Sequence, residues 1–357
     1  MERPVGSSAR GMRASLAATV AIACLGLAGA GRASAPPEPP TVATPEARPE
    51  AAGGAPPSVT ASALAPVLWR ELRYSARKFI FTASTSLTAE RVPAGTVERL
   101  LPRPPKATAI PIPSGDAVAV TTATRLPFGR DETVTLWLDP ATGAALGGEK
   151  TMLGGNPYHK LLRFTEGGLY TSRAAPASGR EDHLGPDRWS DRRQYLTRPA
   201  VQPPEAAAVT DAYALLYLVS AARLDRKDSS LRLVMLTDEG YVELAFVTGG
   251  LSRVRVSFDE SWPGGSRQVA ETLVRSVRAT GHALGTEQPR ADVDLGFLGM
   301  RGALTLFVEV GSGIPVVFSG RAEHVGNLTV RLDRAVLTAA PADPATNPAP
   351  GSGEEAP

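Results

Sequence analysis

The sequence predicts a mainly β protein, in which a curved antiparallel sheet or barrel has one buried α-helix packed against it. Three observations predict this fold class. Apolar and polar residues alternate with a period of two in most regular segments. Turn signals rich in glycine and proline recur about every 8 to 12 residues, a spacing typical of sandwiches and barrels. One segment alone, residues 210–224, has a helical pattern with an uncharged centre.

The chain of 357 residues starts with the features of a secretory signal. Three arginines precede an uncharged apolar run, and Ala33 and Ala35 supply the small residues of a cleavage motif. We therefore expect residues 1–35 to be a signal peptide and the protein to be exported to the periplasm or cell envelope. The alternative is a lipoprotein signal, in which Cys24 is acylated and anchors the mature chain to a membrane.

The charge and cysteine content exclude several classes of protein. The whole chain has a net charge of +2, and the first 35 residues contribute +3 (four arginines against one glutamate), which leaves −1 for the rest. A nearly neutral mature chain argues against nucleic acid as a partner. Cys24 is the one cysteine of the sequence, so the folded part has neither disulfides nor a catalytic thiol.

Composition divides the rest of the chain into three parts. Residues 36–66 contain nine prolines among Ala, Glu, Thr and Gly, a composition that predicts a disordered linker. Residues 339–357 are a second, Pro-rich tail of the same kind. The β-rich domain therefore spans residues 67–338. No part of the mature chain is long and apolar enough to predict a transmembrane helix.

Each stretch of the domain shows alternation interrupted by turn residues. In "ETVTLWLDPATG" (132–143) the apolar residues alternate before a Pro and Gly turn. "KLLRFTEGGLYTSRA" (160–174) predicts a hairpin, and "LRLVMLTDEGYVELAFVTGGLSRVRVSF" (231–258) predicts three strands that turn at "TDEG" and "TGG". In "ALTLFVEVGSGIPVVFSGRAEHVGNLTVRL" (303–332), Leu304, Leu306 and Val308 share a face that covers either a packed interior or a ligand cavity.

The helix is predicted over residues 210–224. Thr210 is the expected N-cap, Asp211 lies in the first turn, and basic residues follow at the carboxyl end, as the helix dipole favours. Residues 212–222 carry no charge. A helix that is apolar nearly all round is buried on more than one side, so we expect it against the concave face of the sheet.

No catalytic, cofactor or metal site is predicted. The sequence has no GxSxG elbow and no HExxH motif. Glu181, Asp182 and His183 are the best metal candidates, but adjacent ligands in a loop rarely form a preorganised site. Asp292, Asp294 and Asp333 are the carboxylates available for a hydrolase, which would require them to converge from separate strands.

Three aromatic residues are candidate ligand or flap contacts. Trp137 falls on the polar face of its strand, where it could stack on a sugar or lipid or pack across the sheet. Trp189 and Tyr195 lie in residues 173–205, a charged segment too long for an ordinary hairpin connection. That segment is either a partly docked flap or disordered.

The order of elements resembles a known family. "LRYSARKFIFTASTSLTAE" (72–90) opens the domain, and the short phrases "LDPATG" (138–143) and "GIPVVFSG" (313–320) occur within it. With the helix and the final strands, these features resemble domain of unknown function 3108, an exported bacterial β-rich family of unknown function. The resemblance covers most of residues 70–337 and implies a curved or closed sheet in the cell envelope. It implies no enzymatic residues.

These observations leave three hypotheses for function. The first is a non-enzymatic cell-envelope protein that binds or carries an apolar, lipid-like ligand within a β-barrel. The second is a structural or assembly partner of other envelope proteins. The third is a hydrolase of an envelope polymer.

Overall fold

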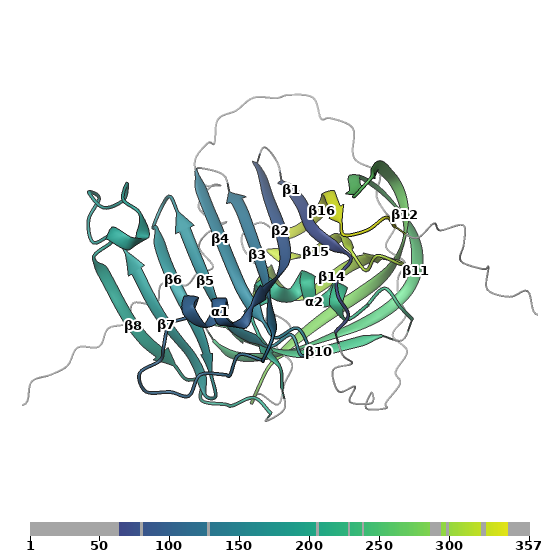
Figure 1. Ribbon diagram of the computed structural model, residues 1–357. Helices are drawn as coiled ribbons and strands as arrows, with labels where there is room; N and C mark the ends of the chain where they lie inside the picture. Colours follow the sequence, from purple (N-terminus) through teal and green to yellow (C-terminus); the bar gives the residue numbers. More distant parts are fainter. Residues whose placement is uncertain are drawn as a thin grey trace, which may run out of the picture.

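The structure is a computed structural model that describes residues 64–78, 81–126, 129–204, 207–227, 229–237, 239–285, 294–297, 300–322 and 326–341. These residues confirm the predicted fold class: they form one mostly antiparallel, curved sheet with a partial ring and two short α-helices (Figure 1). The predicted signal peptide, Cys24 and most of the two Pro-rich segments lie outside the described residues. Within the described ranges, no helix combines the length and apolarity needed to cross a bilayer.

The first half of the chain forms eight strands, each antiparallel to the next. In chain order the elements are β1 (Trp69–Lys78), β2 (Phe81–Pro93), α1 (Ala94–Leu100), β3 (Asp116–Leu126), β4 (Arg130–Leu138), β5 (Ala145–Leu153), β6 (Tyr158–Thr165), β7 (Gly168–Ala175), the 3₁₀ turn η3 (Pro186–Arg188) and β8 (Asp191–Thr197). This half is the open part of the sheet in Figure 1, and β8 is its outermost strand.

The second half of the chain supplies the ring. Its elements are β9 (Val209–Thr210), the 3₁₀ turn η4 (Ala212–Ala214), α2 (Leu215–Ala221), β10 (Ser230–Thr237), β11 (Gly240–Trp262), β12 (Gly265–Ala283), β13 (Asp294–Phe297), β14 (Met300–Glu309), β15 (Pro315–Ala322) and β16 (Gly326–Leu337). The strand order of the whole sheet is β8-β7-β6-β5-β4-β3-β2-β1-β16-β15-β14-β12-β11-β10-β9, with β13 on β14. The last strand therefore lies between the first strand and β15.

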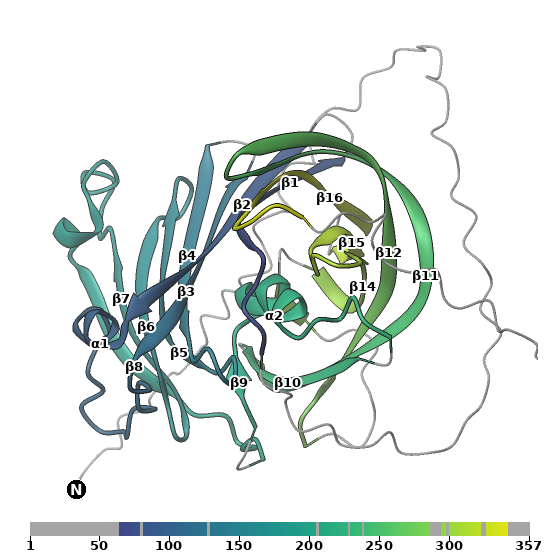
Figure 2. The same ribbon diagram turned by 45° about the vertical axis from the view of Figure 1, so that its right-hand side comes forward.

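The ring is closed over part of its height, because β11 is long enough to return to β16. Residues 259–261 of β11 pair in parallel with residues 334–336 of β16, which joins β16, β15, β14, β12 and β11 in a closed circuit. Figure 2 shows β11 and β12 curving around β14, β15 and β16. Gly249 and Gly250 lie at a register shift between these two long strands. The turn predicted at "TGG" is therefore wrong, because these glycines form a bulge that bends a continuous strand.

A single large core fills the concave side of the sheet. Leu304, Leu306 and Val308 are at most 2% exposed, and they belong to the same apolar cluster as all the apolar residues of α2. Their face thus covers a packed interior. A smaller core lies beneath α1 on the other side of the sheet, where Val97 and Leu101 pack with Trp137 and Leu146. The sequence did not lead us to expect α1.

Two segments differ from the prediction. The helix over 210–224 is shorter than expected, because Thr210 pairs with β10 as part of β9 and the α-helix begins only at Leu215. Asp211, in place of Thr210, caps the 3₁₀ turn η4 that precedes α2, and its side chain accepts a hydrogen bond from the Tyr213 amide. The segment 173–205 is predicted from the sequence to be a partly docked flap or disordered, but its described residues include β8, which pairs with β7 along the whole of β8.

Candidate functional site

The most unusual element of the interior is α2, the short helix on the concave side of the sheet. All seven of its residues are buried, including Tyr217 and Ser220. The Tyr217 ring meets the buried Trp69 edge-on, with ring centroids 6.4 Å apart. A helix of this length has little stability of its own in water, so tertiary packing and the contacts at its two ends must hold it.

The amino-terminal clamp, which we define as Glu132, Lys150 and Tyr213, holds the segment that leads into α2. Lys150 Nζ lies 2.6 Å from Glu132 Oε1, and the Tyr213 hydroxyl donates to Glu132 Oε2 at 2.5 Å. Lys150 Nζ also donates to the Tyr213 hydroxyl at 3.1 Å. Both charged side chains are almost buried, so this ion pair is far less screened than one at the surface.

The protonation states of this clamp follow from burial and charge. Burial alone would lower the pKa of Lys150, but Tyr213 and Glu132 outweigh it and raise that pKa well above its ordinary value. Burial raises the pKa of Tyr213. Lys150 is therefore a cation and Tyr213 a neutral phenol at physiological pH.

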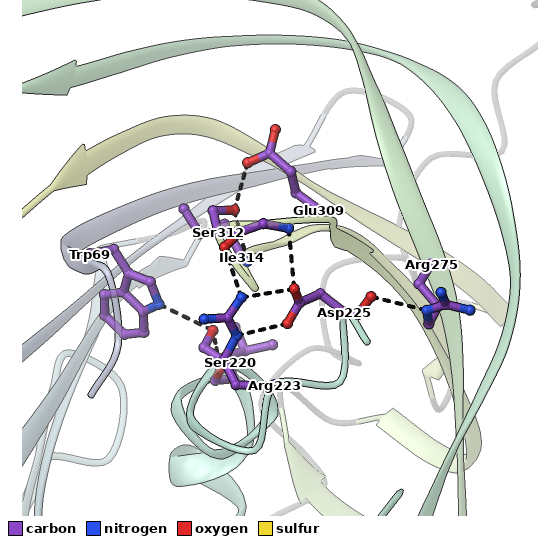
Figure 3. A network of polar contacts seen from close by, with 10 residues as sticks. Trp69, Ser220, Arg223, Asp225, Arg275, Glu309, Ser312 and Ile314 are labelled. Atoms are coloured by element: carbon purple, nitrogen blue, oxygen red, sulfur yellow. Dashed lines mark hydrogen bonds and ion pairs between the residues drawn. The ribbon is translucent and has the colours of Figure 1, made fainter. Parts of the chain in front are cut away.

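The carboxyl-terminal clamp, which we define as Arg223, Asp225 and Gly311, fastens the other end of α2 to the turn between β14 and β15 (Figure 3). Arg223 donates to both Asp225 oxygens at 2.9 Å and to the Gly311 carbonyl at 2.8 Å. The Gly311 amide donates to Asp225 at 3.1 Å. Burial would raise the pKa of Asp225, but the hydrogen bonds from Arg223 and Gly311 and the charge of Arg223 outweigh it, so the pKa is lowered.

Arg223 has an uncommon backbone conformation, with a φ of 55°. It follows the end of α2, where its amide donates to the Ser220 carbonyl and the Leu224 amide donates to the Val219 carbonyl. This is the Schellman arrangement, in which glycine is the usual residue. An arginine here accepts backbone strain of about 1 kcal/mol, and its bidentate pairing with Asp225 offsets that cost.

Further polar contacts extend from this clamp. Trp69 Nε1 donates to Ser220 Oγ at 3.1 Å, and Arg275 Nε donates to the Asp225 carbonyl at 3.0 Å (Figure 3). Ser312 in the β14–β15 turn donates to Glu309 at 2.6 Å. The end of α2 is thus tied to β1 through Trp69, to β12 through Arg275 and to the β14–β15 turn through the Gly311 backbone.

The structure places the three predicted aromatic contacts in different environments. Trp137 is buried in the small core beneath α1. Trp189 is also buried, and its indole donates to the Glu181 carbonyl at 3.0 Å. Tyr195 is exposed on β8. They do not meet in one site, and a ligand contact of any of them stays a prediction.

The candidate acids do not form a metal centre in the described part of the chain, which contains no group of three or more ligating residues. The Glu181 carboxylate instead accepts from the Ser190 amide and hydroxyl and from the Ala177 amide. Asp333 accepts from the Ser75 hydroxyl at an exposed position. Asp292 lies outside the described residues.

Sequence reasoning missed both clamps, although one signal was present. Glu132 is in phase with Val134, Leu136 and Leu138, and Lys150 lies directly across from Val134. Opposite charges at inward positions of neighbouring strands predict a buried pair. The carboxyl-terminal clamp gave no such signal, because Gly311 is 86 residues from Asp225.

Comparison with known proteins gives no family. No family model matches the chain, and no curated protein matches it. Among solved structures, a β-barrel-like protein of domain of unknown function 1849 from Brucella abortus matches with a TM-score of 0.39 and 9% sequence identity, over 77% of this chain and 99% of that one. The resemblance to domain of unknown function 3108 in particular is therefore not confirmed. The comparisons reach only a distant likeness to a β-barrel-like protein of unknown function.

Proposed function

We propose that the protein is a non-enzymatic protein of the cell envelope that binds an apolar, lipid-like molecule with a polar end, in the space that α2 occupies. The observation that carries the proposal is the construction of α2: a wholly buried, seven-residue helix with polar fastening at both ends. Exchanging its apolar side chains for the apolar chain of a ligand would keep the concave face covered.

Two buried polar atoms near the start of this segment support the proposal. The Thr210 hydroxyl has no hydrogen-bond partner among the described residues, and the Tyr158 hydroxyl has none there except the neighbouring Lys150 ammonium group. Buried polar atoms without partners are uncommon and call for an explanation. Tyr158 lies on β6 on the same face as Lys150, since Lys150 pairs with Lys160 and Met152 with Tyr158. The polar end of a ligand would find unused hydrogen-bonding groups there beside a cation.

The location follows from the predicted signal peptide, and an envelope protein as partner is the alternative reading of the same fold. One observation favours that alternative: β8 has no strand on its outer side in the described residues, so an extended segment of a partner could pair with it. Crosslinking in envelope extracts that repeatedly recovers one protein through β8 would support it.

A reversible lock on α2 tests the ligand proposal. Gly143→Cys and Leu218→Cys place two thiols in contact, because a Cβ atom at Gly143 would lie 3.8 Å from Leu218 Cγ. Since Gly143 has a φ of 75°, which strains any L side chain, mass spectrometry verifies formation of the disulfide before binding is measured. In the full chain with Cys24→Ser, the reduced protein should bind a fluorescent long-chain fatty acid and the oxidised protein should not. The control lock is Thr121→Cys with Thr135→Cys, a cross-strand pair away from α2, which should bind in both states.

Two outcomes of this experiment would overturn the proposal. If the reduced protein fails to bind the fatty acid, and native mass spectrometry of the protein purified without detergent shows no bound amphiphile, the interior is core alone. If the oxidised α2 lock binds as well as the reduced protein, any ligand lies elsewhere.

A further inference from the structure

A second candidate site lies at the other end of the sheet, on β6, β7 and β8. A cavity of about 470 Å³ opens there, within the range of about 300–1,000 Å³ that is usual for small-molecule pockets. His159, Ser172 and Gln194 line its floor from three neighbouring strands. These residues alternate along their strands with Lys160 and Arg173, so they occupy the face of the sheet opposite that of the amino-terminal clamp. Figure 1 shows these strands well apart from α2.

One wall of the cavity is a loop with a fixed internal structure. Pro186 and Asp187 of η3 line the cavity from this loop. The Glu181 carboxylate accepts three hydrogen bonds within the loop, from Ala177 and Ser190. Trp189 anchors it with a buried ring and an indole bond to the Glu181 carbonyl. The wall is therefore in place before any ligand arrives, which lowers the entropic cost of binding.

The polar groups in the cavity have unused hydrogen-bonding capacity. Among the described residues, the side chains of Ser172 and Gln194 have no hydrogen-bond partner. His159 bonds Glu149 through Nε2 at 2.8 Å, which leaves Nδ1 unused. Arg192 donates to the Asp187 main-chain carbonyl, and no carboxylate in the described part of the chain pairs with its guanidinium.

The charge of this region favours an anion. Residues 173–198 contain six arginines and four acidic residues, so their net charge is +2, whereas the predicted mature chain as a whole has a net charge of −1. The side chain of Arg173 lies on the opposite face of the sheet, where it pairs with Asp191, which leaves Arg192 as the arginine that offers charge to the cavity. The Asp187 carboxylate also lies on the wall of the cavity, beside Gly185. It can accept hydrogen bonds from the hydroxyl groups of a ligand.

We propose that this cavity binds a small hydroxylated anion, a sugar-sized molecule that carries a carboxylate or a phosphate group. Arg192 takes the anionic group, as guanidinium groups do for both kinds of oxyanion. Ser172, Gln194 and Asp187 exchange hydrogen bonds with the hydroxyls, and Leu161 and Ala174 provide the apolar floor. This site is independent of the proposed ligand space at α2.

Calorimetric titration of the full chain with glucose 6-phosphate, glucuronate and glucose tests the proposal. We expect at least one of the two anions to bind and glucose to bind at least tenfold more weakly. The comparison of phosphate with carboxylate identifies the anionic group. Arg192→Ala should weaken binding about tenfold or more, the loss expected for a charge-assisted hydrogen bond, and Arg192→Lys should restore part of it.

The matched control is Arg193→Ala on the same strand. Arg193 alternates with Arg192, so it points to the opposite face, where it pairs with Asp191. Its replacement removes the same charge from β8 and should change the dissociation constant less than twofold. Equal weakening by Arg192→Ala and Arg193→Ala would show attraction to a basic surface alone and overturn the proposal. So would equal binding of all three sugars, or no binding of any.

Discussion

The hydrogen bonds of Asp225 give a quantitative prediction for the carboxyl-terminal clamp. Asp225→Ala removes a carboxylate that is 3% exposed and that accepts from Arg223 twice and from the Gly311 amide. Arg223, whose side chain is 20% exposed, keeps its charge and loses its counter-charge. Breaking a buried ion pair in this way costs about 3–5 kcal/mol. We expect about 3 kcal/mol, because Arg223 retains its bond to the Gly311 carbonyl.

Urea unfolding followed by tryptophan fluorescence measures this loss. The matched control is Asp191→Ala, whose carboxylate also contacts two arginines, Arg173 and Arg193, but at the surface. Exposed pairs contribute little, so the control should leave the urea midpoint nearly unchanged. Equal shifts of the midpoint in the two variants would refute the reasoning, since burial of Asp225 would then add nothing.

A second replacement distinguishes the cost of leaving Arg223 without a counter-charge from the cost of losing the Asp225 hydrogen bonds. Arg223→Gly combined with Asp225→Ala leaves no charge to compensate and places glycine at the φ of 55°. This double variant should be more stable than Asp225→Ala alone. If it is less stable, the arginine stabilises the fold through contacts other than the ion pair.

Two further predictions concern the core. Burial and nearby Glu309 raise the pKa of Glu260 above 4.5. The folded chain therefore holds this proton more tightly than the unfolded chain does. As a result, the free energy of unfolding falls as pH rises from 4.5 through the raised pKa. Glu260→Gln should show a smaller fall in urea melts between pH 4.5 and about 7, and an equal fall would contradict this. Gly147→Ala would clash with the Leu162 carbonyl as well as with Leu101, and it should destabilise the fold by about 1–3 kcal/mol in thermal melts. Gly95→Ala in α1 should instead stabilise it by about 0.5 kcal/mol. Shifts of the same sign in the two variants would count against the packing account.

The parts of the fold that depend on local pattern could be predicted from the sequence. Alternation placed Leu304, Leu306 and Val308 on one buried face, and the uncharged centre of 212–222 identified the buried helix. Prediction failed where tertiary contacts decide. Gly249 and Gly250 have the composition of a turn, but their strand continues because β12 pairs with it on both sides of them. Residues 173–205 look too polar for a strand, and β7 nonetheless supplies a backbone partner for β8.

The candidate sites show the same division. The charges of Glu132 and Lys150 stand at inward positions that an alternation argument can identify. The partners of Asp225 and the wall of the β6–β8 cavity depend on which distant segments meet, and one sequence does not contain that information.

The placement of β16 bears on how the chain reaches its native state. This strand lies near the middle of the sheet. Until residues 326–337 are available to pair, β1 and β15 each have an unpaired edge. Its register joins Tyr74 to Leu332, and pairings so distant along the chain form slowly. For an exported protein, as we predict this one to be, such a topology would delay completion of the sheet until residues 326–337 have crossed the membrane.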